Sequence, residues 1–246
     1  MSLAWVAILV GCRTTPPETA ISPYLTEPLR FANFTVTQIK PEEVSRFISQ
    51  RVYIGTEDPA PDNYNWLVSE KNPNRFHCET VNEYRAAKKG NYYAATTADM
   101  VVQEWFDLAS DTLDFMANAK PSQHSYLGDY FIDLPVSILS GRLDGSDDDL
   151  IKKDAAEGKT LKDYTKNGSL IHLGKLKVTG NSMIFTDQDN DYDYLVKELA
   201  RGDFDGDGDE DALVLIAGHT LGTLGWSGTC IVTKTGPNRK LKLVAK

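Results

Sequence analysis

The feature that most constrains this 246-residue chain is an acidic stretch from Asp203 to Asp211 in which aspartates occupy every second position. These aspartates are Asp203, Asp205, Asp207, Asp209 and Asp211. Gly208 is the sixth residue of the stretch, where the chain must turn sharply and glycine reaches positive φ without steric cost. A tight loop that binds Ca²⁺ presents oxygen ligands with this spacing. We therefore expect Ca²⁺ to be held by four of the carboxylates and by the backbone carbonyl of Asp209.

Electrostatic repulsion within the stretch supports this interpretation. Carboxylates about 5 Å apart repel each other by roughly 0.8 kcal/mol per pair even at the dielectric constant of water. A bound cation would offset this repulsion. The alternative is a solvated acidic turn, because Asp and Gly are common turn-forming residues. Such a turn gains nothing from an aspartate at every second position, so the pattern favours a metal site.

The residues on either side of the stretch predict strands. Val214 occupies the position where an EF-hand loop would place a bidentate Glu. The apolar run Ala212–Ala217 is typical of a buried strand, and upstream Tyr192, Tyr194 and Val196 recur at every second position. We therefore expect the acidic loop to join two strands, whereas an EF-hand needs a helix on each side.

The segment from Gly202 to Gly208, read with Asp211 and the apolar run, resembles the calcium-binding loop of FG-GAP or VCBS-type repeats. The resemblance covers about residues 192–218. It implies that Ca²⁺ is bound by the carboxylates of Asp203, Asp205, Asp207 and Asp211 and by the carbonyl of Asp209. Propellers of that family repeat the motif in several blades, whereas this chain has one full copy, so we do not expect a propeller.

Two other acidic stretches match the calcium pattern less well. The stretch from Asp187 to Asp193 has Tyr192 where the turn glycine would stand, which predicts an acidic hairpin turn. The stretch from Asp144 to Asp149 is better interpreted as a polar loop or the start of a helix.

The N-terminal residues resemble a bacterial lipoprotein signal. An apolar run from Leu3 leads into Leu9-Val10-Gly11-Cys12, which is similar to a lipobox, although no Lys or Arg precedes it. The resemblance implies a lipid on Cys12 and anchoring to the membrane, in the bacterial periplasm or at the cell surface. Residues 13–28, which are rich in Thr and Pro, are then a tether between residues 1–12 and a domain spanning 29–246. The alternative is an accidental hydrophobic N-terminus.

The net charge and the cysteines bear on the class of partner and on a possible disulfide. The net charge of −9 and the pI near 5.0 lack the basic footprint of a nucleic-acid-binding protein, so no nucleic-acid partner is expected. Cys78 and Cys230 form a candidate disulfide, because an extracytoplasmic compartment permits one. Two buried free thiols are the alternative.

The remaining patterns predict an α+β fold. Helices are expected before residue 160, chiefly at Val81–Lys89 and at Thr97–Lys120, where Trp105 belongs to an apolar core stripe. Residues 31–39 predict a strand and residues 56–74 a long surface loop. From about residue 170 the pattern is that of an antiparallel β meander. We expect one domain, with a subdivision near 140–165 as the alternative.

No catalytic set is convincing. His77 and Cys78 are neighbours in sequence and point apart, and the other histidines lack zinc-ligand spacing. The leading hypothesis is an exported calcium-binding lipoprotein with a binding or structural role, whose expected partner is a protein or another component of the cell envelope. The alternative is an extracytoplasmic hydrolase with a structural calcium, whose groups would be sought at His77 and Cys78 and among the helical acids Glu104, Asp107 and Asp111.

Overall fold

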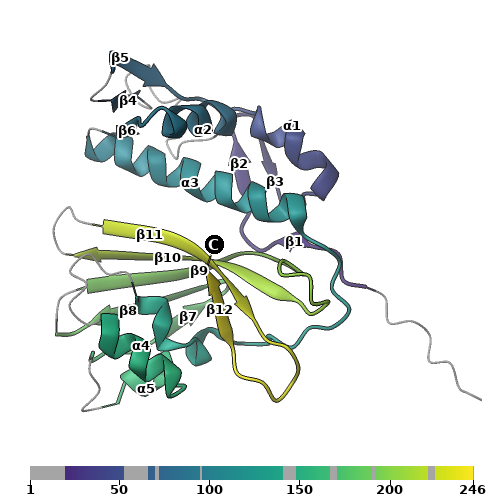
Figure 1. Ribbon diagram of the computed structural model, residues 1–246, viewed down its shortest axis with the longest axis vertical. Coiled ribbons are helices and arrows are strands. Elements are labelled where there is room, and N and C mark those ends of the chain that lie inside the picture. The colour runs from purple at the N-terminus through teal and green to yellow at the C-terminus, as the bar shows by residue number, and fades with distance from the viewer. Residues whose placement is uncertain are drawn as a thin grey trace, which may run out of the picture.

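The centre of the molecule is a seven-stranded antiparallel sheet, seen in the computed structural model (Figure 1). The model describes residues 20–52, 66–69, 72–94, 96–140, 148–166, 171–189, 192–220 and 225–245. Six of the strands follow one another along the chain and are ordered β12-β11-β10-β9-β8-β7: β7 (Lys177–Thr179), β8 (Ser182–Asp187), β9 (Tyr192–Gly202), β10 (Asp211–Thr220), β11 (Gly225–Thr233) and β12 (Lys242–Ala245). The predicted β meander is therefore confirmed.

Of the two longest strands, β10 is buried on both faces of the sheet, whereas β9 is partly exposed on one face, at Asp193. In β9, Tyr192, Tyr194 and Val196 are buried on one face, and in β10 nearly every residue is buried. A strand that is covered on both faces has a continuous run of apolar residues. The residues that follow Asp211 form such a run. The short strand β1 (Tyr24–Leu25) pairs with the end of β9 nearest the acidic loop.

One layer of helices and short strands lies above the sheet in Figure 1. Its helices are a 3₁₀ turn (Pro41–Glu43), α1 (Val44–Ile48), α2 (Val81–Lys89) and α3 (Thr97–Asn118). Its strands form two small sheets: β2 (Leu29–Phe31) with β3 (Phe34–Val36), and β4 (Trp66–Ser69) with β5 (Asn72–His77) and β6 (Tyr93–Ala94).

Two expectations for this layer are correct only in part. The strand predicted over residues 31–39 is a hairpin, in which β2 and β3 pair and Phe31 stacks on Phe34 at 5.1 Å. The loop predicted over residues 56–74 contains β4 and the start of β5, while residues 53–65 lie outside the described part of the chain. Asn and Pro favour turns, but pairing with neighbouring strands overrides that local preference.

The two main helices begin and end close to where the sequence predicts. Helix α2 starts with a capping box, in which the Thr80 hydroxyl accepts a hydrogen bond from the Glu83 amide at 3.2 Å. Helix α3 is capped by Thr96 and ends at Asn118, before Pro121. The rings of Tyr84 and Phe106 stack at 5.1 Å and join the two helices.

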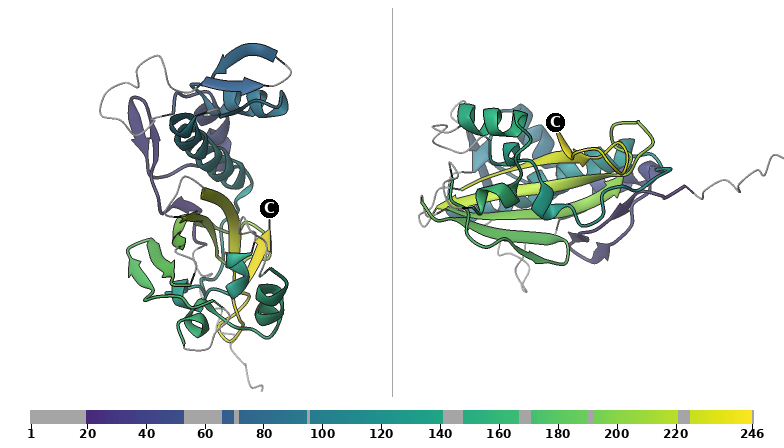
Figure 2. Two further views of the ribbon diagram at one scale, coloured as in Figure 1. Left: turned by 90° about the vertical axis from the view of Figure 1, so that its left-hand side faces the viewer. Right: turned by 90° about the horizontal axis from the view of Figure 1, so that it is seen from below.

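A second layer covers the opposite face of the sheet, as Figure 2 shows. It consists of two 3₁₀ helices (Phe131–Asp133 and Val136–Leu139), α4 (Asp148–Ala156) and α5 (Leu161–Tyr164). Each face of the sheet thus has its own hydrophobic cluster, with Leu199 and Leu213 in the upper one and Val196 and Val214 in the lower one. The architecture is α+β and rich in strand. Among the described residues, no helix is long and apolar enough to cross a membrane.

The candidate disulfide is not formed. Cys78 and Cys230 are free thiols, because Cys78 belongs to the upper hydrophobic cluster whereas Cys230 packs against the lower one. Burial raises the pKa of Cys78 to about 12 and the pKa of Cys230 to about 11, so both are held as thiols. Cys12 lies outside the described residues.

Candidate metal centre

The acidic stretch forms the loop that joins β9 to β10, as expected from the flanking strands. Asp211 is the first residue of β10 and lies opposite Gly202, the last residue of β9. Between them the chain turns twice through glycine, with φ of 87° at Gly206 and 90° at Gly208. A side chain is strained in this left-handed region, so the glycines permit the tight path of the loop.

Three carboxylates of the loop converge. The ligand atoms of Asp203, Asp205 and Asp211 all lie within 4.8 Å of one another. Asp203 and Asp211 are buried, whereas Asp205 is exposed at the mouth of the cluster. Oxygens on opposite sides of a Ca²⁺ ion lie about 5 Å apart, because each ligand is about 2.3–2.6 Å from the ion. One ion can therefore contact all three side chains.

Asp211 is the most constrained of the three. Its Oδ2 accepts hydrogen bonds from the backbone amides of Phe204 at 2.9 Å and Asp205 at 3.3 Å. Its Oδ1 is buried and has no hydrogen-bond partner among the described residues. Burial raises the pKa of Asp211 to about 6, and the nearby Thr233 hydroxyl counters this only in part. A buried carboxylate oxygen without a partner is costly, and a bound cation would remove that cost.

Asp203 and Asp205 organise the loop as well as facing the cluster. Asp203 accepts hydrogen bonds from the amides of Gly206 at 2.6 Å and Gly208 at 3.2 Å. Asp205 accepts one from the amide of Asp207 at 3.1 Å. Burial, followed by the charges of Asp207 and Asp203, raises the pKa of Asp205 even though an amide hydrogen bond lowers it. The loop thus holds its acidic side chains together against their mutual repulsion.

The other two predicted ligands lie differently. The Asp207 carboxylate accepts a hydrogen bond from the Asp209 amide at 2.8 Å and is not part of the converging group. The Asp209 carboxylate lies 3.3 Å from Nδ1 of His124, outside the group. The sequence predicts that Asp209 binds Ca²⁺ through its backbone carbonyl. That prediction does not depend on where the Asp209 side chain points.

A distant segment of the chain borders the loop. Lys120 and Asp203 exchange two backbone hydrogen bonds of 3.0 and 3.1 Å, and the Gln123 amide donates to the Gly208 carbonyl at 2.7 Å. The Glu210 amide donates to the His124 carbonyl at 2.8 Å. Because residues 120–124 follow α3 directly, the loop connects the sheet to the C-terminal end of that helix.

A buried network of ion pairs lies next to the loop. Arg201 forms a two-point ion pair with Glu198, at 2.9 and 3.0 Å, and a third contact of 3.2 Å with Glu210. Both glutamates are buried. The Ser125 hydroxyl donates to Glu210 at 2.6 Å, and Arg201 lies 5.8 Å from the centre of the Tyr130 ring. Arg201 therefore holds together the residues that flank Asp203 and Asp211.

The other acidic stretches behave as turns and helix starts. Asp187 ends β8 and accepts a hydrogen bond from the Asp189 amide at 3.0 Å, within the β8–β9 hairpin that the sequence predicted. Asp148 and Asp149 begin α4, while residues 141–147 lie outside the described part of the chain.

The groups considered for a hydrolase are dispersed. Cys78 is buried, and the ring of His77 lies 4.0 Å from Glu79. Asp107 pairs with Lys88 of α2 at 2.7 Å, and Asp111 accepts a hydrogen bond from Thr229 of β11 at 2.6 Å. Among the helical acids named for this role, Glu104 lines a cleft between α3 and the sheet.

Other side chains that line that cleft were not recognised from the sequence. Trp105 was assigned to the core but is 37% exposed there. His219 was treated as isolated, yet β10–β11 pairing places it on the same face of the sheet as Ser227: Ala217 lies opposite Ser227 and His219 opposite Gly225. Side chains alternate between the two faces along paired strands. Once the strand register is known, this alternation predicts that His219 and Ser227 lie on the same face.

Comparisons with protein-family models, curated proteins and solved structures give no match. The geometry of the described residues therefore carries the functional argument.

Proposed function

We propose that this chain is a calcium-binding protein in which Ca²⁺ fastens the β9–β10 hairpin to the segment that follows α3. The observation that carries this proposal is the buried Asp211 oxygen without a partner, within a group that also contains Asp203 and Asp205. The carbonyl of Asp209 and water would complete the six to eight oxygen ligands that Ca²⁺ takes.

The donor set suits Ca²⁺ better than other common metals. All three side chains offer carboxylate oxygens, and the group contains no Cys or His of the kind that zinc and copper favour. Mg²⁺ demands ligands at about 2.0–2.1 Å in near-ideal octahedral geometry and is seldom held by an all-protein cage. A loop of aspartates meets the less strict geometry of Ca²⁺.

The position of the β9–β10 loop indicates how bound Ca²⁺ would affect the rest of the molecule. Asp203 shares backbone hydrogen bonds with Lys120, and Phe204 contacts Phe115 of α3 with ring centres 5.8 Å apart. Ca²⁺ would rigidify the loop and, through these contacts, the attachment of α3 to the sheet. We propose a structural or binding role on this basis, because the groups considered for a hydrolase are dispersed.

Thermal unfolding tests the proposal. After chelator treatment, added Ca²⁺ is expected to raise the midpoint of unfolding, since a ligand that binds only the folded state stabilises it by RT ln(1 + [Ca²⁺]/Kd), which is about 2.7 kcal/mol at 100 times Kd. Asp205→Asn should remove this response, whereas Asp189→Asn should retain it, because Asp189 lies outside the converging group. An unchanged midpoint in millimolar Ca²⁺, or equal responses of the two variants, would contradict the proposal.

The lipid anchor is a separate proposal, which rests on the lipobox resemblance at Cys12. Expression of the chain in a bacterial host is expected to place it in the membrane fraction, and Cys12→Ser should release it into the soluble extracytoplasmic fraction. Cys78→Ser serves as the control, because that thiol is buried in the core. Equal membrane association of the wild-type chain and the Cys12→Ser variant would refute the anchor.

A further inference from the structure

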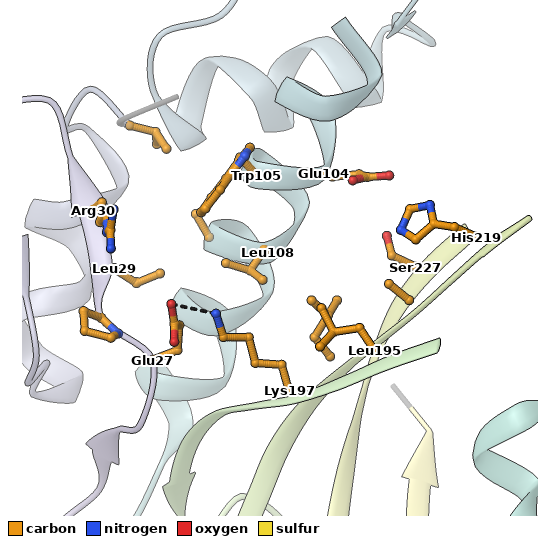
Figure 3. A pocket seen from close by; sticks show the side chains of 15 residues that line it. Glu27, Leu29, Arg30, Glu104, Trp105, Leu108, Leu195, Lys197, His219 and Ser227 are labelled. Atoms are coloured by element: carbon orange, nitrogen blue, oxygen red, sulfur yellow. Dashed lines mark ion pairs between the residues drawn. The ribbon is translucent and has the colours of Figure 1, made fainter. Parts of the chain in front are cut away.

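An apolar cleft of about 270 Å³ lies between α3 and the sheet. Figure 3 shows α3 above it, the strands below it, and β2 with the residues before it at one side. Its apolar lining includes Leu29, Trp105, Leu108, Leu195 and Leu215. Ligand pockets have this character, with mostly apolar walls and a few polar groups that fix orientation.

Toward its C-terminal end, α3 contacts the sheet and the loop that joins β9 to β10. There the Phe115 and Phe204 rings meet, and Asp111 accepts the hydrogen bond from Thr229. Toward the N-terminal end, Trp105 stays 37% exposed and Leu108 is only half-buried. A large aromatic side chain over an uncovered sheet face is unusual for a core position and typical of a binding site.

The two ends of the cleft carry opposite charges. At one end Glu104 points toward His219 and Ser227 (Figure 3). At the other end are Arg30 and the ion pair between Glu27 and Lys197, at 2.8 Å. Neither Glu104 nor Arg30 has an ion pair within the described part of the chain. Within the described part of the chain, the cleft is thus bordered by one carboxylate and one guanidinium that have no ion pair, separated by apolar side chains.

We infer that this cleft binds a small zwitterion with an apolar body, such as a short apolar peptide with free termini. The ammonium group would face Glu104, with the His219 and Ser227 side chains as further hydrogen-bonding groups. The carboxylate would face Arg30, whose planar guanidinium suits carboxylate binding. The apolar body would contact Trp105 and the leucines. This inference goes beyond calcium binding and does not depend on it.

The cleft volume favours a small ligand over a folded partner. It is just below the range of roughly 300–1,000 Å³ for small-molecule pockets. A fatty acid matches less well, because its apolar tail would end at the polar group formed by Glu104, His219 and Ser227. A ligand with a charged group at each end would give both Glu104 and Arg30 a partner.

Isothermal titration calorimetry with leucyl-phenylalanine tests the inference, using the intact chain in saturating Ca²⁺. We expect binding to the wild-type protein and a loss of about tenfold or more in affinity on Glu104→Gln, because a hydrogen bond to a charged group is lost. N-acetyl-leucyl-phenylalanine should bind about equally weakly to the wild type and to Glu104→Gln. Arg30→Gln should weaken the free dipeptide but not its C-terminal amide.

Asp107→Asn is the matched control, since it makes the same charge change on α3 but faces Lys88 of α2. It should leave dipeptide affinity unchanged. Absence of binding at millimolar dipeptide, or equal affinity of the free and acetylated dipeptides for the wild type, would overturn the inference. Because Ca²⁺ binding is measured separately by thermal unfolding, failure of this inference is distinguishable from failure of the calcium proposal.

Discussion

Replacing Asp211 with Asn is expected to stabilise the calcium-free protein and to abolish its response to Ca²⁺. The Asn oxygen can still accept the hydrogen bonds from the amides of Phe204 and Asp205. The amide group would replace the unpartnered charged oxygen and donate toward the carboxylates of Asp203 and Asp205. A gain of about 1–3 kcal/mol in the free energy of unfolding is expected without Ca²⁺, because a buried polar atom acquires a partner.

Asp211→Ala separates the two roles of this side chain. It removes the acceptor of two backbone amides, so we expect a loss of about 1–3 kcal/mol in stability as well as loss of the calcium response. Chemical denaturation of both variants with chelator and with Ca²⁺ measures these effects. If Asp211→Asn keeps the calcium-dependent stabilisation of the wild type, Asp211 is not a ligand and its role is only to cap the loop.

Arg201→Met is expected to destabilise the protein by about 3–5 kcal/mol, since it leaves two buried carboxylates without their partner. The side chains of Glu198 and Glu210 are only 5% and 3% exposed. Urea unfolding would measure the loss. Because the network flanks the metal loop, a weaker calcium response is expected to accompany it.

Lys166→Met is the control for Arg201→Met, because Lys166 also pairs with a carboxylate at 2.7 Å but at the surface. Exposed ion pairs contribute only about 0–1 kcal/mol, so this variant should remain close to the wild type. Adding Glu198→Gln and Glu210→Gln to Arg201→Met should recover much of the lost stability. Equal effects of the Arg201 and Lys166 variants would show that the buried network is not a main source of stability.

The sequence predicted those helices and strands that are marked by residues close together in the chain. Thr80, Glu83 and Gly90 mark the limits of α2, and the apolar run after Asp211 marks β10. The hairpin of β2 and β3 was missed, because it depends on pairing and on the stacking of Phe31 against Phe34 and Phe47. The absence of a Cys78–Cys230 bridge likewise follows from the sheet that separates the two hydrophobic clusters.

The sequence by itself determined the acidic loop, its glycine turns and the strands on either side, because each depends on residues that are near neighbours along the chain. Only the tertiary structure decided that Asp203, Asp205 and Asp211 converge while Asp207 caps the turn. It also decided that Glu104, His219 and Arg30 border one cleft. These groups come from a helix and from strands far apart in sequence, and their proximity is set by how α3 packs on the sheet.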